Sequence, residues 1–232
     1  MDLLIEEKLQ EQYSGSMGNM ESSDFRGTNS GVCCRGRDDI LLSAYDIVRI
    51  QKHLGVSFKT LTGKYCELLI GSVSGVPLVR IRRREPSGTC PFLTRDKCGI
   101  QEAKPTACAL FPAVRPMRLL QGTEGKEAPY VVRKVCCGTG EAHTSMKEWV
   151  RKCITEYGER CADLWDDMLE VMSRVIPILE NPTSEETYAL AAEFMYCDYD
   201  NAKDFATELE SRVKLFREFV RRVQENEGSV IQ

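Results

Sequence analysis

Cysteine constrains this chain more than any other residue type. There are 11 cysteines among 232 residues, and only two histidines, His53 and His143. This is about 5% cysteine, below the roughly 8–10% of small disulfide scaffolds, and the number is odd. Histidine is nearly absent, so a metal site here would consist mostly of sulfur ligands. Sulfur ligands favour zinc, an iron–sulfur cluster or Cu(I) over magnesium, calcium or manganese.

The compartment decides how the cysteines are interpreted. The N-terminus has neither a basic segment nor a long apolar run, so it does not resemble a secretory signal. No apolar run reaches the roughly 18 residues that a membrane span needs. We therefore expect a cytoplasmic protein without membrane contact, in which structural disulfides do not persist and clustered cysteines are metal ligands or redox groups.

Charge is distributed unevenly along the chain. Residues 25–137 contain most of the cysteines and carry 19 basic and nine acidic side chains, whereas residues 138–232 carry 11 basic and 20 acidic ones. A basic environment lowers thiol pKa values and stabilises thiolates. We favour this role, with docking to the acidic C-terminal half, over the rival interpretation of a nucleic-acid patch.

The patterns in the first half predict a mixture of helices and strands. Ser43 with Asp46 predicts a capping box, followed by a helix that ends at Gly55. The range 57–70 predicts a second helix, with Leu61, Tyr65, Leu68 and Leu69 on its apolar face. In 77–84, apolar residues alternate with arginines, which predicts a half-buried strand, and 113–120 and 130–135 are further candidate strands.

The second half has helical periodicity. Ser145 with Glu148 predicts another capping box, and an apolar stripe continues to Ile176. Pro177 and the Asn181-Pro182 pair interrupt the stripe. Two more helices are expected near 184–197 and 201–225.

These elements together predict an α+β fold. A small antiparallel sheet with helices and cysteine-bearing loops would form a metal-binding core, followed by an all-helical C-terminal region. We expect a flexible tail at 1–24, a cysteine-cluster metal-binding domain at 25–140 and a helical domain at 141–232.

The cysteines of the central segment stand beside turn-forming residues. The pattern is Cys33-Cys34, then Cys90, Cys98 and Cys108, then Cys136-Cys137. Pro91, Gly99, Pro105 and Gly138 lie close to them, and short rigid turns can present sulfurs from distant segments to one metal. Side chains of adjacent residues diverge in extended chain, so one cysteine of each pair packs, or the two serve different metals or a cluster.

The same segment resembles a known family, the YkgJ-like cysteine-cluster proteins, which are zinc- or iron-chelating domains of the CxxCxxCC type. The resemblance rests on four pieces: 25–34, 42–50, the cysteine-rich run 90–112, and 136–141 with the sequence Cys-Cys-Gly-Thr-Gly-Glu. It implies six metal ligands, which are Cys33, Cys34, Cys90, Cys98, Cys108 and Cys136.

This sequence departs from the family pattern at several positions. Gly27 and Ser30 occupy the positions of the first two family cysteines, Cys137 that of a proline and Lys104 that of an arginine. Six sulfurs fill one four-coordinate site with two to spare, but cannot fill two separate all-thiolate tetrahedral sites without sharing. A reduced metal content and a site that has lost its metal are both compatible with this pattern.

Other candidate residues have plainer interpretations. We expect Cys66, in the middle of the second predicted helix, and Cys153, Cys161 and Cys197 to pack in the core. For Cys137, metal ligation and core packing both stay open. His143 is expected to be exposed at a helix entry. Residues 82–84, three consecutive arginines, are interpreted as a solvated face.

The leading functional hypothesis is a metal-binding protein that holds zinc, iron or an iron–sulfur cluster through thiolates. One alternative is a protein lysine N-methylase, because flagellin lysine N-methylases resemble the family in their cysteine region. The chain has no glycine-rich strand–turn–helix signature of a doubly wound methyltransferase domain. A thiol metal chaperone or redox protein is the other alternative. The expected partners are a metal ion and a protein bound through the helical C-terminal region, and we expect no nucleic acid.

Overall fold

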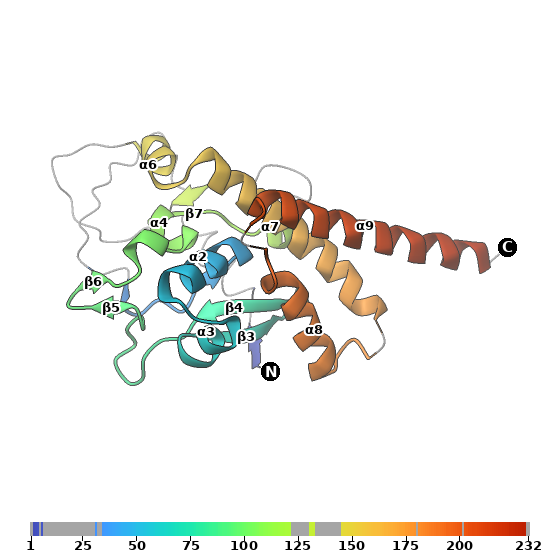
Figure 1. Ribbon diagram of the computed structural model, residues 1–232, viewed down its shortest axis with the longest axis horizontal. Coiled ribbons are helices and arrows are strands. Elements are labelled where there is room, and N and C mark those ends of the chain that lie inside the picture. The colour runs from blue at the N-terminus through green and yellow to red at the C-terminus, as the bar shows by residue number, and fades with distance from the viewer. Residues whose placement is uncertain are drawn as a thin grey trace.

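A small sheet occupies the N-terminal half of the molecule. The structure is a computed structural model that describes residues 2–4, 6, 31, 34–121, 130–132, 145–179, 181–200 and 202–230. Its strands lie in the order β1-β3-β4-β2. β3 (Cys66–Gly71) and β4 (Pro77–Ile81) form an antiparallel hairpin, and β2 (Leu41–Leu42) pairs antiparallel with β4. The predicted combination of helices with a small antiparallel sheet is confirmed (Figure 1).

β4 follows the predicted alternation over its last three residues, whereas Leu78, on the same face as Arg80, is buried. Val79 and Ile81 are buried in the core, while Arg80 between them is half-buried. Arg80 donates from Nε to Glu67 Oε1 at 2.8 Å on the neighbouring strand. A cross-strand ion pair of this kind satisfies the polar face of a strand whose other face is packed.

The helix predicted at 57–70 is wrong in its second half. α3 (Phe58–Lys64) ends early, and Cys66 begins β3 instead of lying in the middle of a helix. The run Cys66-Glu-Leu-Leu-Ile fits the periodicity of a helix as well as that of a strand. Its pairing with β4 decides in favour of the strand, since tertiary contacts override weak local preference.

The N-terminus contributes a strand that the sequence did not predict. β1 (Asp2–Leu4) pairs in parallel with β3, so these residues of the expected tail belong to the sheet. Glu6 is buried, and its carboxylate accepts hydrogen bonds from Val73 N and Ser74 N, each at 2.8 Å. The buried carboxylate thereby satisfies backbone donors of the β3–β4 turn.

Both capping boxes are confirmed. α2 (Ala44–Leu54) begins at Ser43, whose hydroxyl accepts from Asp46 N at 3.1 Å, and ends at Gly55 in the left-handed conformation. α6 (Met146–Cys153) begins at Ser145 in the same way.

Short elements connect the sheet to the helical half. They are β5 (Leu93–Thr94), β6 (Lys97–Cys98), η2 (Gln101–Ala103), α4 (Thr106–Leu110), β7 (Ala113–Val114), α5 (Arg118–Gln121) and β8 (Val131–Val132). The strand predicted over 113–120 is therefore limited to two residues. It pairs with β8, and α5 replaces its second half.

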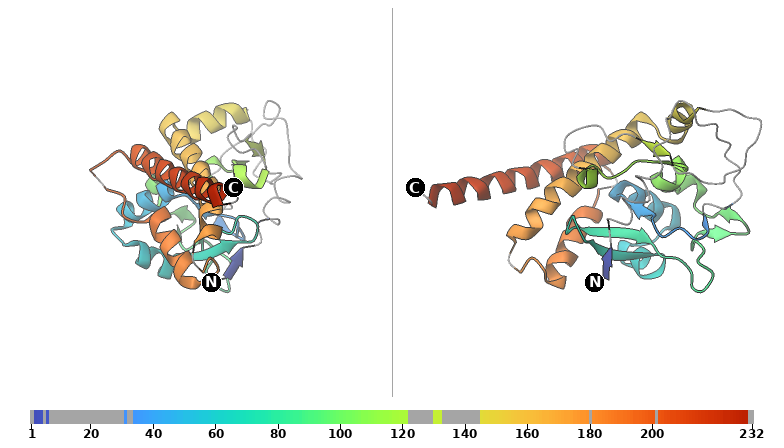
Figure 2. Two further views of the ribbon diagram at one scale, coloured as in Figure 1. Left: turned by 90° about the vertical axis from the view of Figure 1, so that its right-hand side faces the viewer. Right: turned by 180° about the vertical axis from the view of Figure 1, so that it is seen from behind.

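Long helices dominate the C-terminal half, as predicted. They are α7 (Glu156–Val175), η3 (Ile176–Ile178), α8 (Glu185–Tyr196) and α9 (Phe205–Val230). η3 and the left-handed Asn181 interrupt the helices where the prolines predict it. Figure 2 shows that α9 runs beside α7 and then projects beyond the rest of the molecule.

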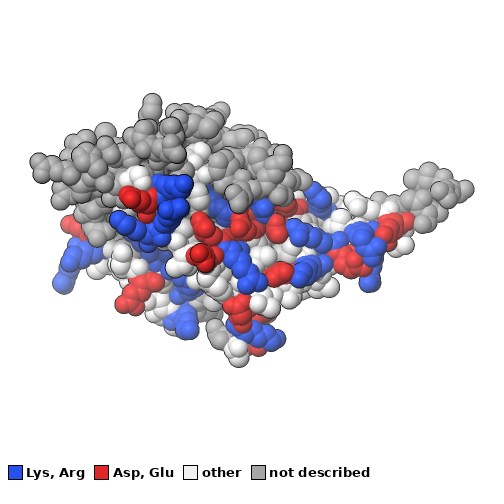
Figure 3. Space-filling model, turned by 90° about the horizontal axis from the view of Figure 1, so that it is seen from above, with Lys and Arg blue, Asp and Glu red and all other residues white. Residues whose placement is uncertain are grey.

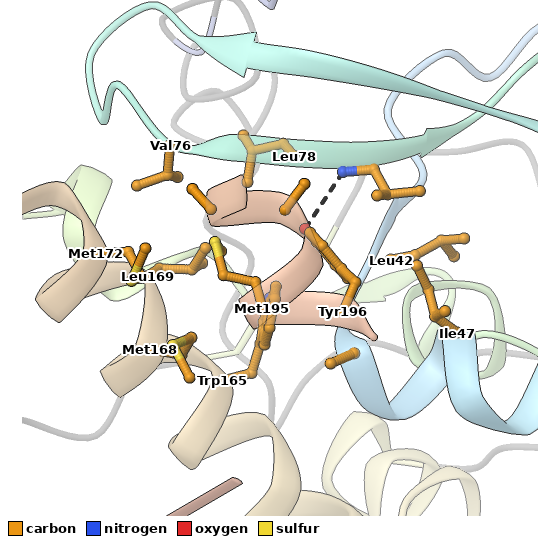
Figure 4. Close-up of a cluster of buried hydrophobic side chains, with 14 of the residues drawn as sticks. Leu42, Ile47, Val76, Leu78, Trp165, Met168, Leu169, Met172, Met195 and Tyr196 are labelled. Carbon is orange, nitrogen blue, oxygen red and sulfur yellow. Dashed lines mark hydrogen bonds between the residues drawn. The ribbon is translucent and has the colours of Figure 1, made fainter. Parts of the chain in front are cut away.

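One hydrophobic cluster joins the sheet and the C-terminal helices. α8 lies between β4 and α7, and the Tyr196 hydroxyl accepts a hydrogen bond from Val79 N at 3.3 Å (Figure 4). The side chains drawn around Tyr196 come from both halves of the chain: Leu42, Ile47, Val76, Leu78, Trp165, Met168, Leu169, Met172 and Met195.

Ion pairs also cross between the halves. Arg115 pairs with Asp163 and, at 3.0 Å, with Asp166 on α7, and Arg118 lies 3.5 Å from Asp166. Their polarity agrees with the expected docking of a basic segment on an acidic one. Residue 140 lies outside the described ranges, so the division into 25–140 and 141–232 stays a prediction.

Opposite charges alternate along α9 (Figure 3). Arg221 and Arg222 both pair with Glu218 within the helix.

Within the residues that the structure describes, none of the helices combines the length and the apolar character that crossing a bilayer requires.

Candidate metal centre

Backbone hydrogen bonds place Cys34 next to Cys90. Cys90 N donates to Cys34 O at 2.8 Å, and Arg35 and Thr89 form an antiparallel bridge. Gly36, with a φ of +69°, lets the chain turn away immediately afterwards. Two cysteines that are far apart in sequence therefore lie side by side, with Cys34 at the end of a 3-10 turn and Cys90 directly after the bridge.

A tight hairpin presents Cys98 to the same region. β5 and β6 pair Leu93 with Cys98, and Arg95 and Asp96 at the turn both have positive φ. Gly99 N donates to Phe92 O at 2.7 Å. A Cβ on Gly99 would lie 3.0 Å from that oxygen, so glycine allows this close approach. The turn residues expected beside the cysteines thus shape the loop directly.

Arginine side chains hold the loop from outside. Arg84 donates to Pro91 O at 2.6 Å and to Leu93 O at 3.2 Å. Arg82 donates to the carbonyl groups of Thr62 and Gly63. Arg82 and Arg84 are exposed, in agreement with the solvated face predicted for residues 82–84. Arg84 in addition holds the backbone between Cys90 and Cys98 through these hydrogen bonds.

Cys108 lies in the five-residue helix α4, which is fixed at both ends by other helices. Asp46 of α2 accepts hydrogen bonds from Thr106 at its start. Trp149 Nε1 of α6 donates to Leu110 O at 2.8 Å at its end. The sequence predicts Asp46 only as part of the capping box of its own helix. Pro105 was the signal that α4 needs a hydrogen-bond acceptor from elsewhere, because a proline side chain cannot cap a helix.

The four described candidate cysteines influence one another electrostatically. A hydrogen bond from the Cys34 side chain lowers the pKa of the Cys90 thiol, and the Phe92 backbone N–H acts in the same direction. Burial and the nearby Cys108 and Cys98 oppose this shift. A thiol that several neighbours act on in this way lies within a cysteine cluster.

The remaining described cysteines have the opposite character. Burial raises the pKa of Cys66 to about 12, and of Cys161 and Cys197 to about 11. Cys66 and Cys161 are buried in the core, whereas Cys153 and Cys197 are half-buried. High pKa values make poor thiolate ligands at neutral pH, so these cysteines fit a packing role.

Of the six predicted ligands, the structure describes Cys34, Cys90, Cys98 and Cys108. Cys34 lies beside Cys90, and Cys98 and Cys108 are near enough to Cys90 to raise the pKa of its thiol. Cys33 and Cys136 lie outside the described residues, as do Gly27, Ser30, Cys137 and His143. Over the described part of the chain, no three cysteine, histidine, aspartate or glutamate side chains converge closely enough to hold a metal ion. The chemistry of the donors nevertheless fits zinc or iron, because every one of them is sulfur.

The fold and the cysteine loops define a class: an α+β protein with a cysteine cluster in its loops and a helical C-terminal region. Residues 28–138 match the model of the CxxCxxCC family, described as "Putative zinc- or iron-chelating domain". This match confirms the resemblance that the sequence pieces carry. Comparison with curated proteins and with solved structures finds no match.

Proposed function

We propose that this protein binds zinc or iron through cysteine thiolates drawn from Cys33, Cys34, Cys90, Cys98, Cys108 and Cys136. The observation that carries the proposal is the pairing of Cys34 with Cys90, with Cys98 and Cys108 near enough to act on the Cys90 thiol. The family model that matches this segment, described as "Putative zinc- or iron-chelating domain", supports the proposal.

The contribution of each segment follows from its local structure. Cys34 and Cys90 are fixed relative to each other by backbone hydrogen bonds, whereas Cys98 and Cys108 are carried by a hairpin and a short helix. A bound metal would supply the cross-link among these segments, and metal binding of this kind is coupled to folding.

The experiment is metal analysis with an absorbance spectrum on anaerobically purified full-length protein. We expect zinc or iron in the wild type, and lost metal in Cys98→Ser and Cys108→Ser. Broad visible absorbance would identify an iron–sulfur cluster, while a colourless protein with zinc would identify a mononuclear thiolate site. Cys153→Ser is the matched control, because Cys153 is also half-buried but packs in a separate cluster.

Unchanged metal content in both Cys98→Ser and Cys108→Ser would contradict the proposed ligands. Absence of metal from the wild type, even after incubation with zinc or ferrous iron, would contradict metal binding itself.

A thiol-redox role is a second candidate, supported by the hydrogen bond between the Cys34 and Cys90 side chains. Oxidation would join the two sulfurs, with loss of two protons and transfer of two electrons to a disulfide such as oxidised glutathione. Thiol counting after equilibration with glutathione buffers tests this role. Full retention of both thiols under oxidising buffers would exclude it.

A further inference from the structure

Asp46 joins two helices that are distant in sequence. Its carboxylate is buried, with the residue only 2% exposed. Oδ2 accepts a hydrogen bond from Ser43 N at 3.2 Å within the capping box of α2. Oδ1 accepts from Thr106 N at 2.9 Å and from Thr106 Oγ1 at 2.8 Å at the start of α4.

α4 depends on external contacts for its position. It has five residues, far fewer than the roughly 12–15 that an isolated helix needs for marginal stability in water. Pro105 occupies its N-cap position and makes no side-chain cap. The first N–H of α4 is therefore satisfied by a carboxylate of α2, and this bond lies two residues before Cys108.

We propose that Asp46 is a positioning residue for the metal centre, holding Cys108 in the orientation that ligates metal. The inference rests on the proposed metal-binding function. It adds a residue that contacts no metal and acts through Thr106. Outer groups that orient metal ligands affect metal affinity strongly, because a misdirected ligand binds less well even when its sulfur is intact.

The surroundings of the Asp46 carboxylate agree with this role. Arg49 Nη1 lies 3.8 Å from Asp46 Oδ1, and Arg49 also donates to Glu102 O at 3.4 Å in the neighbouring η2. Three hydrogen-bond donors and one nearby cation surround the carboxylate, so its charge is satisfied without a metal. It therefore acts as an outer support and is not a ligand.

Four full-length variants separate positioning from general stability. Asp46→Ala removes the whole link, and Thr106→Val removes only the hydroxyl bond. Thr106→Ser retains that hydroxyl and is the conservative rescue. Ser43→Ala weakens the N-cap of α2 while leaving the carboxylate in contact with Thr106, so it is the stability control.

The first measurement is zinc release from each loaded protein to a colorimetric chelator. We expect Asp46→Ala to release zinc at least about 10-fold faster than the wild type, the lower end of the range for such outer groups. Thr106→Val should shift the rate the same way by less. Thr106→Ser and Ser43→Ala should release zinc like the wild type, although Ser43→Ala melts at a lower temperature.

The second measurement is the visible spectrum of the cobalt(II)-substituted proteins, which reports ligand geometry independently of stability. Asp46→Ala and Thr106→Val should alter the thiolate–cobalt bands, and Ser43→Ala should not. Wild-type release rates and spectra in both Asp46→Ala and Thr106→Val would overturn the inference while leaving the proposed function intact.

Equal acceleration of release in Ser43→Ala and Asp46→Ala would likewise overturn it, since a stability loss alone would then explain the effect. If the wild type takes up neither zinc nor cobalt, the inference is overturned. The proposed function then stands or falls separately, on whether the wild type takes up iron. If Asp46→Ala fails to fold, the Thr106→Val and Thr106→Ser pair decides the question.

Discussion

The helical half and the cysteine loops differ in how much each depends on apolar packing. α7 and α8 place Trp165, Met168, Leu169, Met172 and Met195 in one continuous apolar core. The loops from 84 to 112 consist of elements of two to five residues and reach the same core through Phe92, Ile100 and Ala103. Arg84 donates hydrogen bonds to these loops, and Asp46 accepts them from Thr106. Apolar burial dominates the first region, whereas the second region adds polar clamps to a smaller share of the core.

This difference indicates where a metal would matter. A cross-link contributes most where the chain is otherwise weakly constrained, because it limits the unfolded conformations of long loops. We therefore expect changes in the helical half to act on global stability and changes in the loops to act through the metal.

The largest expected effect is in the helical core. Leu169 is 1% exposed, and Leu169→Ala should lower the free energy of unfolding by about 2–5 kcal/mol, through lost burial and the cavity left behind. Denaturant unfolding with and without chelator measures it, and the loss should be the same in both. Leu190→Ala, at an exposed site on α8, is the control and should change stability by less than about 0.5 kcal/mol.

The contact between the two regions should respond to pH through Asp166. Burial raises the pKa of Asp166 from 3.8 to about 6, against the lowering effect of Arg115 and Arg118. The folded state therefore takes up a proton between about pH 6 and pH 4 that the unfolded state does not yet bind. The stability contributed by this group rises as the pH falls through that window and is lost as the pH rises again.

From pH 7 to pH 4 the stability of the wild type should therefore increase relative to that of Asp166→Asn by about 2.5 kcal/mol. One pKa unit corresponds to about 1.4 kcal/mol, and the same carboxyl group in the unfolded state already takes up part of its proton near pH 4. Unfolding curves of both proteins across this range test the expectation, because other carboxyl groups cancel in the difference. A difference that stays flat with pH, or that changes in the opposite direction, would show that the arginines outweigh burial.

Metal removal should affect the loops alone. With free metal at about 100 times its dissociation constant, binding adds about 2.7 kcal/mol, so chelation should accelerate amide exchange at Cys90 and Gly99 by about 100-fold. Their N–H groups donate to Cys34 O and Phe92 O within the loops. Amides of Met168 and Met172 in α7 should exchange at unchanged rates, and equal acceleration in α7 would mean that the two regions open together.

The smallest expected effect concerns Arg84. Arg84→Gln removes the donors to Pro91 O and Leu93 O and should lower stability by about 1 kcal/mol, typical of one net hydrogen bond at a partly exposed site. Arg82→Gln carries the same charge change outside the cysteine loop and should cost less. If the two variants have the same melting temperature, the hydrogen bonds from Arg84 to the loop contribute nothing beyond the charge of the side chain.

Local signals in the sequence predicted the helices better than the contacts among the loops. The capping boxes at Ser43 and Ser145 and the break at Asn181-Pro182 were predictable, because each depends on a few neighbouring residues. β3 was not, since Cys66-Glu-Leu-Leu-Ile becomes a strand only through pairing with β4. β1 depends on the same sheet and carries no local pattern of its own.

In the candidate site, too, local signals were predictable from the sequence and contacts through space were not. Cysteine spacing, neighbouring turn residues and the family resemblance predict one ligand set: Cys33, Cys34, Cys90, Cys98, Cys108 and Cys136. Sequence could not identify Arg84 or the bond between Asp46 and Thr106, because these contacts join residues through space and follow no periodic pattern.

The projection of α9 has a hydrodynamic consequence. The helix has 26 residues, which corresponds to about 39 Å at 1.5 Å per residue, and its last turns extend past the body of the molecule (Figure 1). An arm of this kind increases frictional drag, so the protein should sediment more slowly than a sphere of equal mass. A fluorophore attached near Val230 would stand well away from the cysteine loops, which makes that end a suitable place for a reporter of rotational diffusion.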